Sequence, residues 1–158
     1  MSVEADGRVA ETVEIAAPPE AAYAVVTDVA GLPRWAAETV ACHWVGGATG
    51  AQVGARFRGT NRHGPVRWST TCTVTTADPG RAFGFRVTMG PLPVSEWRYD
   101  IEPAPAGCRV TESWRDLRPG IARVLGGIAI GVLNRPAHNR ANMRSTLARL
   151  KQHLESGR

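Results

Sequence analysis

The chain has 158 residues, a length that predicts one domain spanning residues 1–158. Apolar residues make up 43% and charged residues 21%, which excludes a disordered chain, a collagen-like fibre and a disulfide-rich miniprotein. The net charge of +5 is uneven, because residues 1–40 carry seven acids and two arginines, whereas residues 118–158 carry eight bases and one acid.

A strand and a pair of short helices are predicted first, after a flexible N-terminus at residues 1–7. Residues 8–15 alternate between two faces, and the inward face carries Val9, Glu11, Val13 and Ile15. Pro18 and Pro19 are typical of the first turn of a helix, where their missing N–H groups cost nothing. Gly31 and Pro33 are predicted to end this helix, and a short helical turn then runs to near Trp35.

Six further strands are predicted between residues 38 and 116. Turns rich in glycine and proline separate runs of alternating side chains, which gives strands at 38–45, 53–62, 66–76, 81–88, 94–102 and 108–116. The regular spacing favours one antiparallel meander with one solvated face.

The chain is predicted to end in a long helix. A stripe of side chains recurs at helical spacing and is formed by Leu133, Pro136, Arg140, Met143, Leu147, Leu150 and Leu154. Pro136 is predicted to break this helix from the apolar segment 121–133. Residues 118–135 are therefore a candidate lid helix, and His138 and Asn139 are expected to precede the main helix.

This order of elements, with Pro33 and Trp35 closing the short helix pair, resembles the SRPBCC superfamily. That superfamily includes START lipid-transfer domains and birch-pollen-allergen-like proteins, and the chain is most similar to its bacterial polyketide cyclase/dehydrase group. The segments that carry the resemblance are residues 13–35, 77–87, 97–103, 107–114 and 143–155.

The resemblance implies an α+β helix-grip fold. Seven antiparallel strands form a curved sheet wrapped around the long C-terminal helix, and a deep, largely apolar cavity lies between them. The apolar segment 121–133 and Pro136 depart from the single continuous helix that is common in the family. Fold resemblance alone does not assign an activity.

Aromatic side chains dominate the predicted inward face. They are Phe57, Trp68, Phe83, Phe85, Trp97, Tyr99 and Trp114. Flat aromatic walls suit polycyclic, steroid-like or fatty ligands, although the same rings can simply fill a core. The further candidate ligand contacts are Trp35, Asn61, Thr70, Asn139 and Met143.

Glu112 is the candidate acid or base, because it lies between the inward residues Val110 and Trp114. Burial would raise its pKa and suit it to proton transfer near neutral pH. The alternative is a carboxylate paired with an arginine or with backbone donors. Tyr99 is a candidate proton donor to a ligand. Glu11 has the same phase on the first strand, and a register that placed it beside Glu112 would make the two a coupled pair.

No metal and no cofactor are expected. Cys42, Cys72 and Cys108 are scattered, without the spacing of a zinc site or a disulfide framework. No set of His, Asp and Glu has metal-ligand spacing, and no phosphate-binding, dinucleotide or serine-hydrolase motif is present. His63, in a turn, and His153, near the C-terminus, are expected to be solvated.

Three functions remain open at this point. The first is binding of a hydrophobic, cyclic or polyketide-like small molecule in the internal cavity. The second is a cofactor-independent polyketide cyclase or dehydratase, in which the cavity folds a flexible chain and Glu112 moves protons. The third is a lipid- or membrane-associated interaction module that uses residues 121–133.

The expected partner is a hydrophobic small molecule. No basic face with interleaved aromatic residues is apparent, so nucleic acid is not expected. The apolar segment 121–133 is shorter than the roughly 20 residues of a spanning helix, and the first ten residues lack the apolar core of a signal peptide. We expect a cytoplasmic monomer or homodimer without stable membrane insertion. The arginine-rich composition, with Lys151 the only lysine, is typical of a GC-rich bacterial genome.

Overall fold

The computed structural model describes residues 8–36, 38–121, 125 and 135–156. The helical elements are α1 (Pro19–Thr27), a 3₁₀ helix η1 (Val29–Arg34) and α3 (Arg135–Ser156). The strands are β1 (Arg8–Ile15), β2 (Thr39–Val45), β3 (Arg56–His63), β4 (Val66–Asp78), β5 (Ala82–Met89), β6 (Leu92–Ala104) and β7 (Gly107–Asp116).

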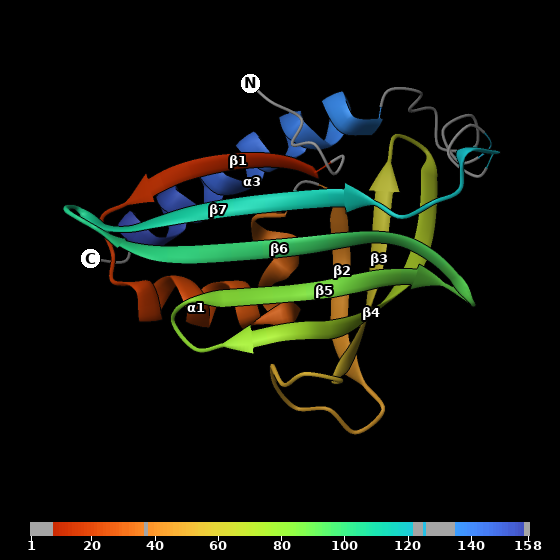
Figure 1. Ribbon diagram of the computed structural model, residues 1–158, viewed down its shortest axis with the longest axis horizontal. Coiled ribbons are helices and arrows are strands. Elements are labelled where there is room, and N and C mark those ends of the chain that lie inside the picture. Colours follow the sequence, from red (N-terminus) through yellow and green to blue (C-terminus); the bar gives the residue numbers. More distant parts are fainter. Residues whose placement is uncertain (1–7, 37, 122–124, 126–134, 157–158) are drawn as a thin grey trace.

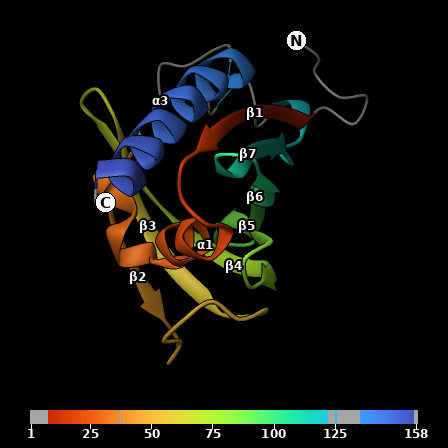
Figure 2. The same cartoon turned by 90° about the vertical axis from the view of Figure 1, so that its left-hand side faces the viewer.

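The seven strands form one antiparallel sheet in the order β1-β7-β6-β5-β4-β3-β2 (Figure 1). Only the pairing of β1 with β7 joins strands that are distant in sequence. The sheet curves, and α3 lies across its open side while α1 lies near one end (Figure 2). This architecture confirms the predicted α+β fold with a curved seven-stranded sheet and a C-terminal helix.

The short helix pair is confirmed, but its break lies earlier than predicted. Pro18 is extended (φ −68°, ψ 155°) and Pro19 begins α1, as expected for a proline-led helix. The helix ends at Thr27, whose hydroxyl donates to the Tyr23 carbonyl at 2.7 Å. Gly31 lies inside η1, where a Cβ would meet the Asp28 carboxylate at 2.8 Å. A side chain at this position would displace the Asp28 carboxylate, and Gly31 does not end a helix as predicted.

The third predicted strand begins later than expected. This strand was predicted to begin at Val53, but Val53 is 69% exposed and precedes β3. Gly54 has φ +90°, a backbone conformation that favours glycine, and its N–H donates to the Val74 carbonyl at 2.8 Å. This turn lies just before Arg56, where β3 begins. β4 and β6 run further than predicted, to 13 residues each.

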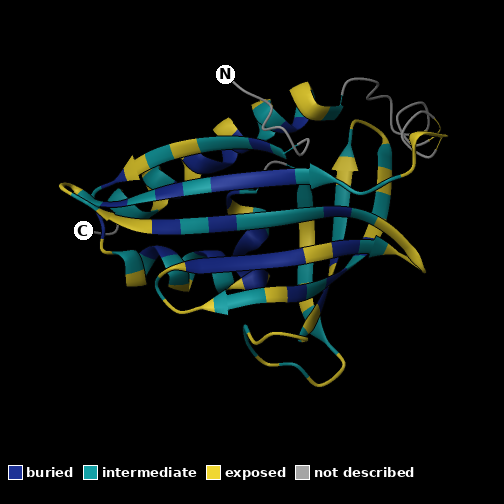
Figure 3. Ribbon diagram, in the orientation of Figure 1, coloured by how far each residue is buried: buried dark blue, intermediate teal, exposed yellow. Residues whose placement is uncertain are grey.

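The core lies between the sheet and the helices, with buried residues along the central strands β5, β6 and β7 (Figure 3). On α3 the buried side chains are Asn139, Met143, Thr146, Leu147 and Leu150. The predicted stripe is therefore correct for its C-terminal half only. At its other end Pro136 is exposed, and the Nε atom of Arg140 lies 3.5 Å from Glu11 at the edge of β1. Arg140 is therefore only partly buried, unlike Met143, Leu147 and Leu150.

Some predictions fall outside the described residues. The flexible N-terminus at 1–7 lies wholly outside them, as does most of the candidate lid at 118–135. Ile121 and Leu125, which are described, are exposed. Among the described helices, none combines the length and the apolar character that a bilayer crossing requires.

Candidate functional site

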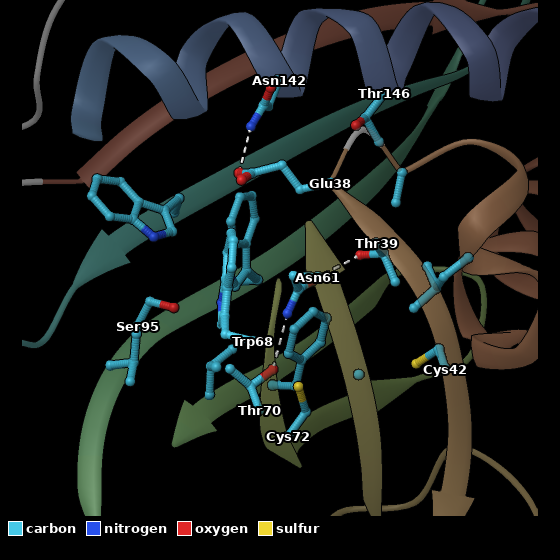
Figure 4. A pocket seen from close by; sticks show the side chains of 18 of the residues that line it. Glu38, Thr39, Cys42, Asn61, Trp68, Thr70, Cys72, Ser95, Asn142 and Thr146 are labelled. Atoms are coloured by element: carbon cyan, nitrogen blue, oxygen red, sulfur yellow. Dashed lines mark hydrogen bonds between the residues drawn. The ribbon is translucent and has the colours of Figure 1, made fainter. Parts of the chain in front are cut away.

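A cavity of about 240 Å³ lies between the inner face of the sheet and α3. Strands β2 to β7, η1 and α3 all contribute to its wall. Figure 4 labels lining side chains from β2, β3, β4, β6 and α3. The volume is slightly below the range of about 300–1,000 Å³ that is common for small-molecule sites. A compact ligand therefore fits better than a long flexible one.

Ten of the residues predicted to form the site line this cavity. They are Phe57, Asn61, Trp68, Thr70, Phe85, Trp97, Tyr99, Glu112, Trp114 and Met143. Trp35 and Phe83 lie behind the wall instead. Trp35 packs edge-on against Tyr99, with ring centroids 6.0 Å apart, and Phe83 packs on Phe85 at 5.6 Å. Both rings support the cavity wall from the core without lining it.

Asn139 also lies outside the cavity wall. It was expected to precede the last helix, but it lies inside α3 and is fully buried. Neither its amide nitrogen nor its amide oxygen has a hydrogen-bond partner. The physical reason for its burial is helical spacing, because Asn139 is one turn before Met143, which packs with Val9 and Trp114.

Edge-to-face ring contacts hold the aromatic wall. Trp44 packs on Phe57 at 5.5 Å between centroids, and Phe57 packs on Phe85 at 5.1 Å. Trp97 and Trp114 pair at 6.5 Å in a tilted arrangement on the β6–β7 side. Edge-to-face packing is a preferred geometry for aromatic pairs, so the contacts of Phe57 favour the ring positions observed here.

Glu112 and Tyr99 form a buried pair. They are direct partners across β6 and β7, and the Tyr99 hydroxyl donates to Glu112 Oε1 at 2.9 Å. Burial raises the pKa of Glu112 to about 8, although the Tyr99 hydrogen bond partly lowers it. Burial and the neighbouring carboxyl also raise the pKa of Tyr99 well above its usual value. Glu112 is therefore largely protonated at pH 7, and its Oε2 is buried with no partner.

Glu11 lies directly opposite Glu112 in the β1–β7 register. This is the register that a coupled pair of the two carboxyl groups would require. Its carboxylate, however, accepts a hydrogen bond from Arg144 Nε at 3.1 Å and lies 3.5 Å from Arg140 Nε. The raised pKa of Glu112 is caused by burial, and Glu11 does not contribute to it. The two carboxyl groups therefore do not form the coupled pair considered from the sequence.

Asn61 is held by two threonines on the cavity wall (Figure 4). The Thr39 hydroxyl donates to Asn61 Oδ1 at 3.3 Å, and Asn61 Nδ2 donates to Thr70 Oγ1 at 3.4 Å. Asn61 therefore links β2, β3 and β4 and is not a rim residue that contacts only water.

Sequence reasoning missed the polar end of the cavity, which is centred on Glu38. Asn142 Nδ2 donates to Glu38 Oε1 at 2.7 Å (Figure 4), and Arg135 Nη2 lies 3.2 Å from the same oxygen. The Arg135 guanidinium also lies 5.9 Å from the centroid of the Trp68 ring. Arg135 and Asn142 are seven residues apart on α3, a spacing that places both on one helix face and offered a sequence signal.

His63 was expected to lie solvated in a turn, whereas it is only partly exposed. It ends β3 and packs edge-on against His138, with ring centroids 4.8 Å apart. His138 lies in α3 rather than before it, and its Nε2 is 3.4 Å from Glu38 Oε1. Within the described ranges, Glu38, His63 and His138 are the group whose ligand atoms lie close enough together to suggest a metal.

Solved structures from other proteins share this fold. A crystal structure from Deinococcus radiodurans is 21% identical, covers 96% of this chain and 99% of its own, and has a TM-score of 0.67. A polyketide-cyclase-like protein from Corynebacterium glutamicum is 28% identical, with 94% and 91% covered and a TM-score of 0.62. The di-domain ARO/CYC StfQ of the steffimycin biosynthetic pathway is 13% identical, with 94% of this chain and 51% of that chain covered and a TM-score of 0.73.

Sequence comparison identifies the family of this chain. A search of curated proteins found no matching sequence. The model of the family described as polyketide cyclase / dehydrase and lipid transport matches residues 6–155, almost the whole chain. The segments that suggested this resemblance, from 13–35 to 143–155, all lie inside that match. The chain therefore belongs to the polyketide cyclase/dehydrase and lipid transport family.

Proposed function

We propose that the protein binds a hydrophobic, cyclic or polyketide-like small molecule in the cavity between the sheet and α3. The observation that carries this proposal is an aromatic-walled cavity of about 240 Å³ that contains a neutral buried carboxyl group. Family membership supports a hydrophobic ligand, and two of the structural neighbours come from biosynthetic loci, those of steffimycin and dynemicin.

The walls favour a flat ligand. Phe57, Phe85, Trp97 and Trp114 present aromatic rings, and burial of apolar ligand surface against them contributes roughly 25 cal/mol per Å². Glu112 adds selectivity, because its protonated carboxyl lacks a partner at Oε2. A neutral acid donates a hydrogen bond, so the preferred ligand carries an acceptor such as a ketone or phenol oxygen.

A second candidate function is cofactor-independent cyclisation or dehydration, and the Glu112–Tyr99 pair favours it. Tyr99 holds Oε1, which leaves Oε2 to protonate a ligand oxygen as a general acid. A pKa near 8 keeps the proton in place at neutral pH and suits the group to reversible transfer. The cavity would supply much of the rate by holding a short, compactly folded chain in one reactive conformation.

Ligand capture is the first test of the binding function. Native mass spectrometry of the purified chain would detect a retained molecule, and quenching of tryptophan fluorescence would follow titration with two probes. One is a hydroxylated anthraquinone and the other a saturated C16 fatty acid. We expect the anthraquinone to bind one per chain and more tightly than the fatty acid. If neither probe quenches and no molecule is retained, the binding proposal is wrong.

Substitution of Glu112 separates binding from catalysis. Glu112→Gln keeps the shape and a donor, so probe affinity should change only a few-fold. If the protein is an enzyme, turnover of a poly-β-keto substrate should be lost, because an amide cannot transfer the proton. Glu96→Gln is the matched control, since Glu96 pairs with Arg86 at 3.0 Å away from the cavity wall. Full turnover in Glu112→Gln would remove Glu112 from the mechanism.

A further inference from the structure

Three distant segments converge at the polar end of the cavity. Glu38 lies just before β2, His63 ends β3 and His138 lies in the first turns of α3. The Arg62 N–H donates to the Glu38 carbonyl at 2.8 Å, which fixes Glu38 beside the end of β3. One ligand atom from each of the three side chains lies within 4.8 Å of the others.

Two atoms of this cluster are buried without a hydrogen-bond partner. They are His138 Nε2 and Glu38 Oε2. His138 Nε2 lies 3.4 Å from Glu38 Oε1, which is long for a hydrogen bond. A buried polar atom without a partner costs about 1–3 kcal/mol, so such atoms call for an explanation. A cation bound between them would satisfy both lone pairs at once.

The carboxylate of Glu38 is oriented by outer partners, as metal ligands usually are. Asn142 donates to Oε1 at 2.7 Å and Arg135 lies 3.2 Å from it, which leaves Oε2 free for coordination. Tetrahedral ligands about 2.1 Å from a metal lie roughly 3.4 Å apart, so ligand atoms that now lie within 4.8 Å of one another need to close by up to about 1.4 Å.

The ligand set selects the class of metal. Two imidazoles and one carboxylate suit borderline divalent ions such as Zn²⁺, whereas Mg²⁺ and Ca²⁺ require mainly oxygen ligands. The positive charge of Arg135 also disfavours ions that depend on carboxylate charge alone.

We propose that Glu38, His63 and His138 form a binding site for one borderline divalent transition-metal ion, with Zn²⁺ the representative, beside the cavity. Three protein ligands leave one position of a tetrahedral ion for water or for an oxygen of a bound molecule. The site was not expected from the sequence, because its ligands are 25 and 75 residues apart in the chain. It does not depend on the proposed ligand, so the two proposals can fail separately.

Zinc binding by the tag-free full chain tests the site. Competition with a chromophoric chelator should give one Zn²⁺ per chain, and the visible absorption of Co²⁺ should report a four- or five-coordinate ion. His63→Ala and His138→Ala should weaken binding by more than the roughly 10–100-fold typical of losing an outer partner. His43→Ala and His153→Ala are matched controls, because both side chains are exposed and lie outside the cluster, and they should bind as the wild type does.

Further variants keep the result interpretable. Circular dichroism and thermal unfolding without metal identify variants that fail to fold. Asn142→Ala retains all three ligands and, as a positioning residue, should lose about 10–100-fold in affinity while the Co²⁺ spectrum keeps its form. Sub-stoichiometric binding by the wild type would overturn the proposal, and so would equal losses in the control histidine variants. Loss of binding in Cys42→Ala would instead assign the metal to a cavity thiol.

Discussion

The carboxyl group of Glu112 makes the free energy of unfolding depend on pH. Its pKa is about 8 in the folded chain against a usual value of 4.5, so the folded state binds this proton more tightly than the unfolded state. The stabilisation is complete below pH 4.5 and is lost as the pH rises through 8. Between pH 4.5 and 7 the expected loss is about 3 kcal/mol, at 1.36 kcal/mol per pH unit.

Urea denaturation at pH 5 and at pH 7 measures this effect. The wild type should lose more stability over this interval than Glu112→Gln, because glutamine does not titrate. Glu96→Gln should retain the wild-type dependence, since Glu96 is only partly buried and paired with Arg86. Parallel behaviour of wild type and Glu112→Gln would show that the folded-state pKa of Glu112 is not raised.

At the residue scale, alternation predicted which strand side chains face inward but not their partners. The phase of β7 placed Glu112 on the same face as Val110 and Trp114, and all three are buried. Its bond to Tyr99 depends on the β6–β7 register, which the sequence pattern does not determine. The cluster at Glu38 was missed for the same reason, because it forms only when β2, β3 and α3 meet.

At the scale of elements, α3 is held by apolar packing more than by its surface ion pairs. Leu150 is fully buried in the main core, so Leu150→Ala should cost about 2–5 kcal/mol of unfolding free energy. Arg144, whose side chain is 55% exposed, pairs with Glu11, and Arg144→Ala should cost no more than about 1 kcal/mol. Chemical denaturation of the two variants checks the contrast, and similar losses would show that the ion pairs anchor the helix.

The predicted elements were correct where one local signal dominated. Strand β1 has the predicted bounds, because alternation is uninterrupted from Arg8 to Ile15. The errors lie where tertiary contacts compete with local pattern. Arg140 follows the helical stripe but turns to Glu11, and Asn139 takes the buried position instead. A hydrophobic pattern does not reveal an ion pair between α3 and β1.

At the scale of the whole molecule, the cavity results from sheet curvature and the position of α3. The strand order places β7 beside β1, and α3 lies across the open side of the curved sheet (Figure 2). Sequence patterning predicted most of the wall residues because they share the inward face. It did not predict that Trp35 and Phe83 lie behind the wall, since strand pairing and helix placement together decide which rings border empty space.

Gly59 offers a way to fill the cavity without disturbing the fold. It lines the cavity on β3, and a Cβ there would meet Thr70 Oγ1 at 3.7 Å, an ordinary van der Waals distance. Gly59→Val should therefore fold, since valine suits a strand, while its methyl groups occupy ligand space.

Anthraquinone affinity should fall about tenfold or more in Gly59→Val, because inserted methyl groups in a filled site cost about 1–3 kcal/mol. Gly50→Val is the control, since a Cβ at Gly50 meets nothing within 4 Å and Gly50 lies outside the cavity wall. Tryptophan quenching gives the affinities and thermal unfolding confirms the folded state. Unchanged affinity in a folded Gly59→Val would place the ligand elsewhere, because a compact cavity of about 240 Å³ cannot take a tricyclic ring and an added side chain together.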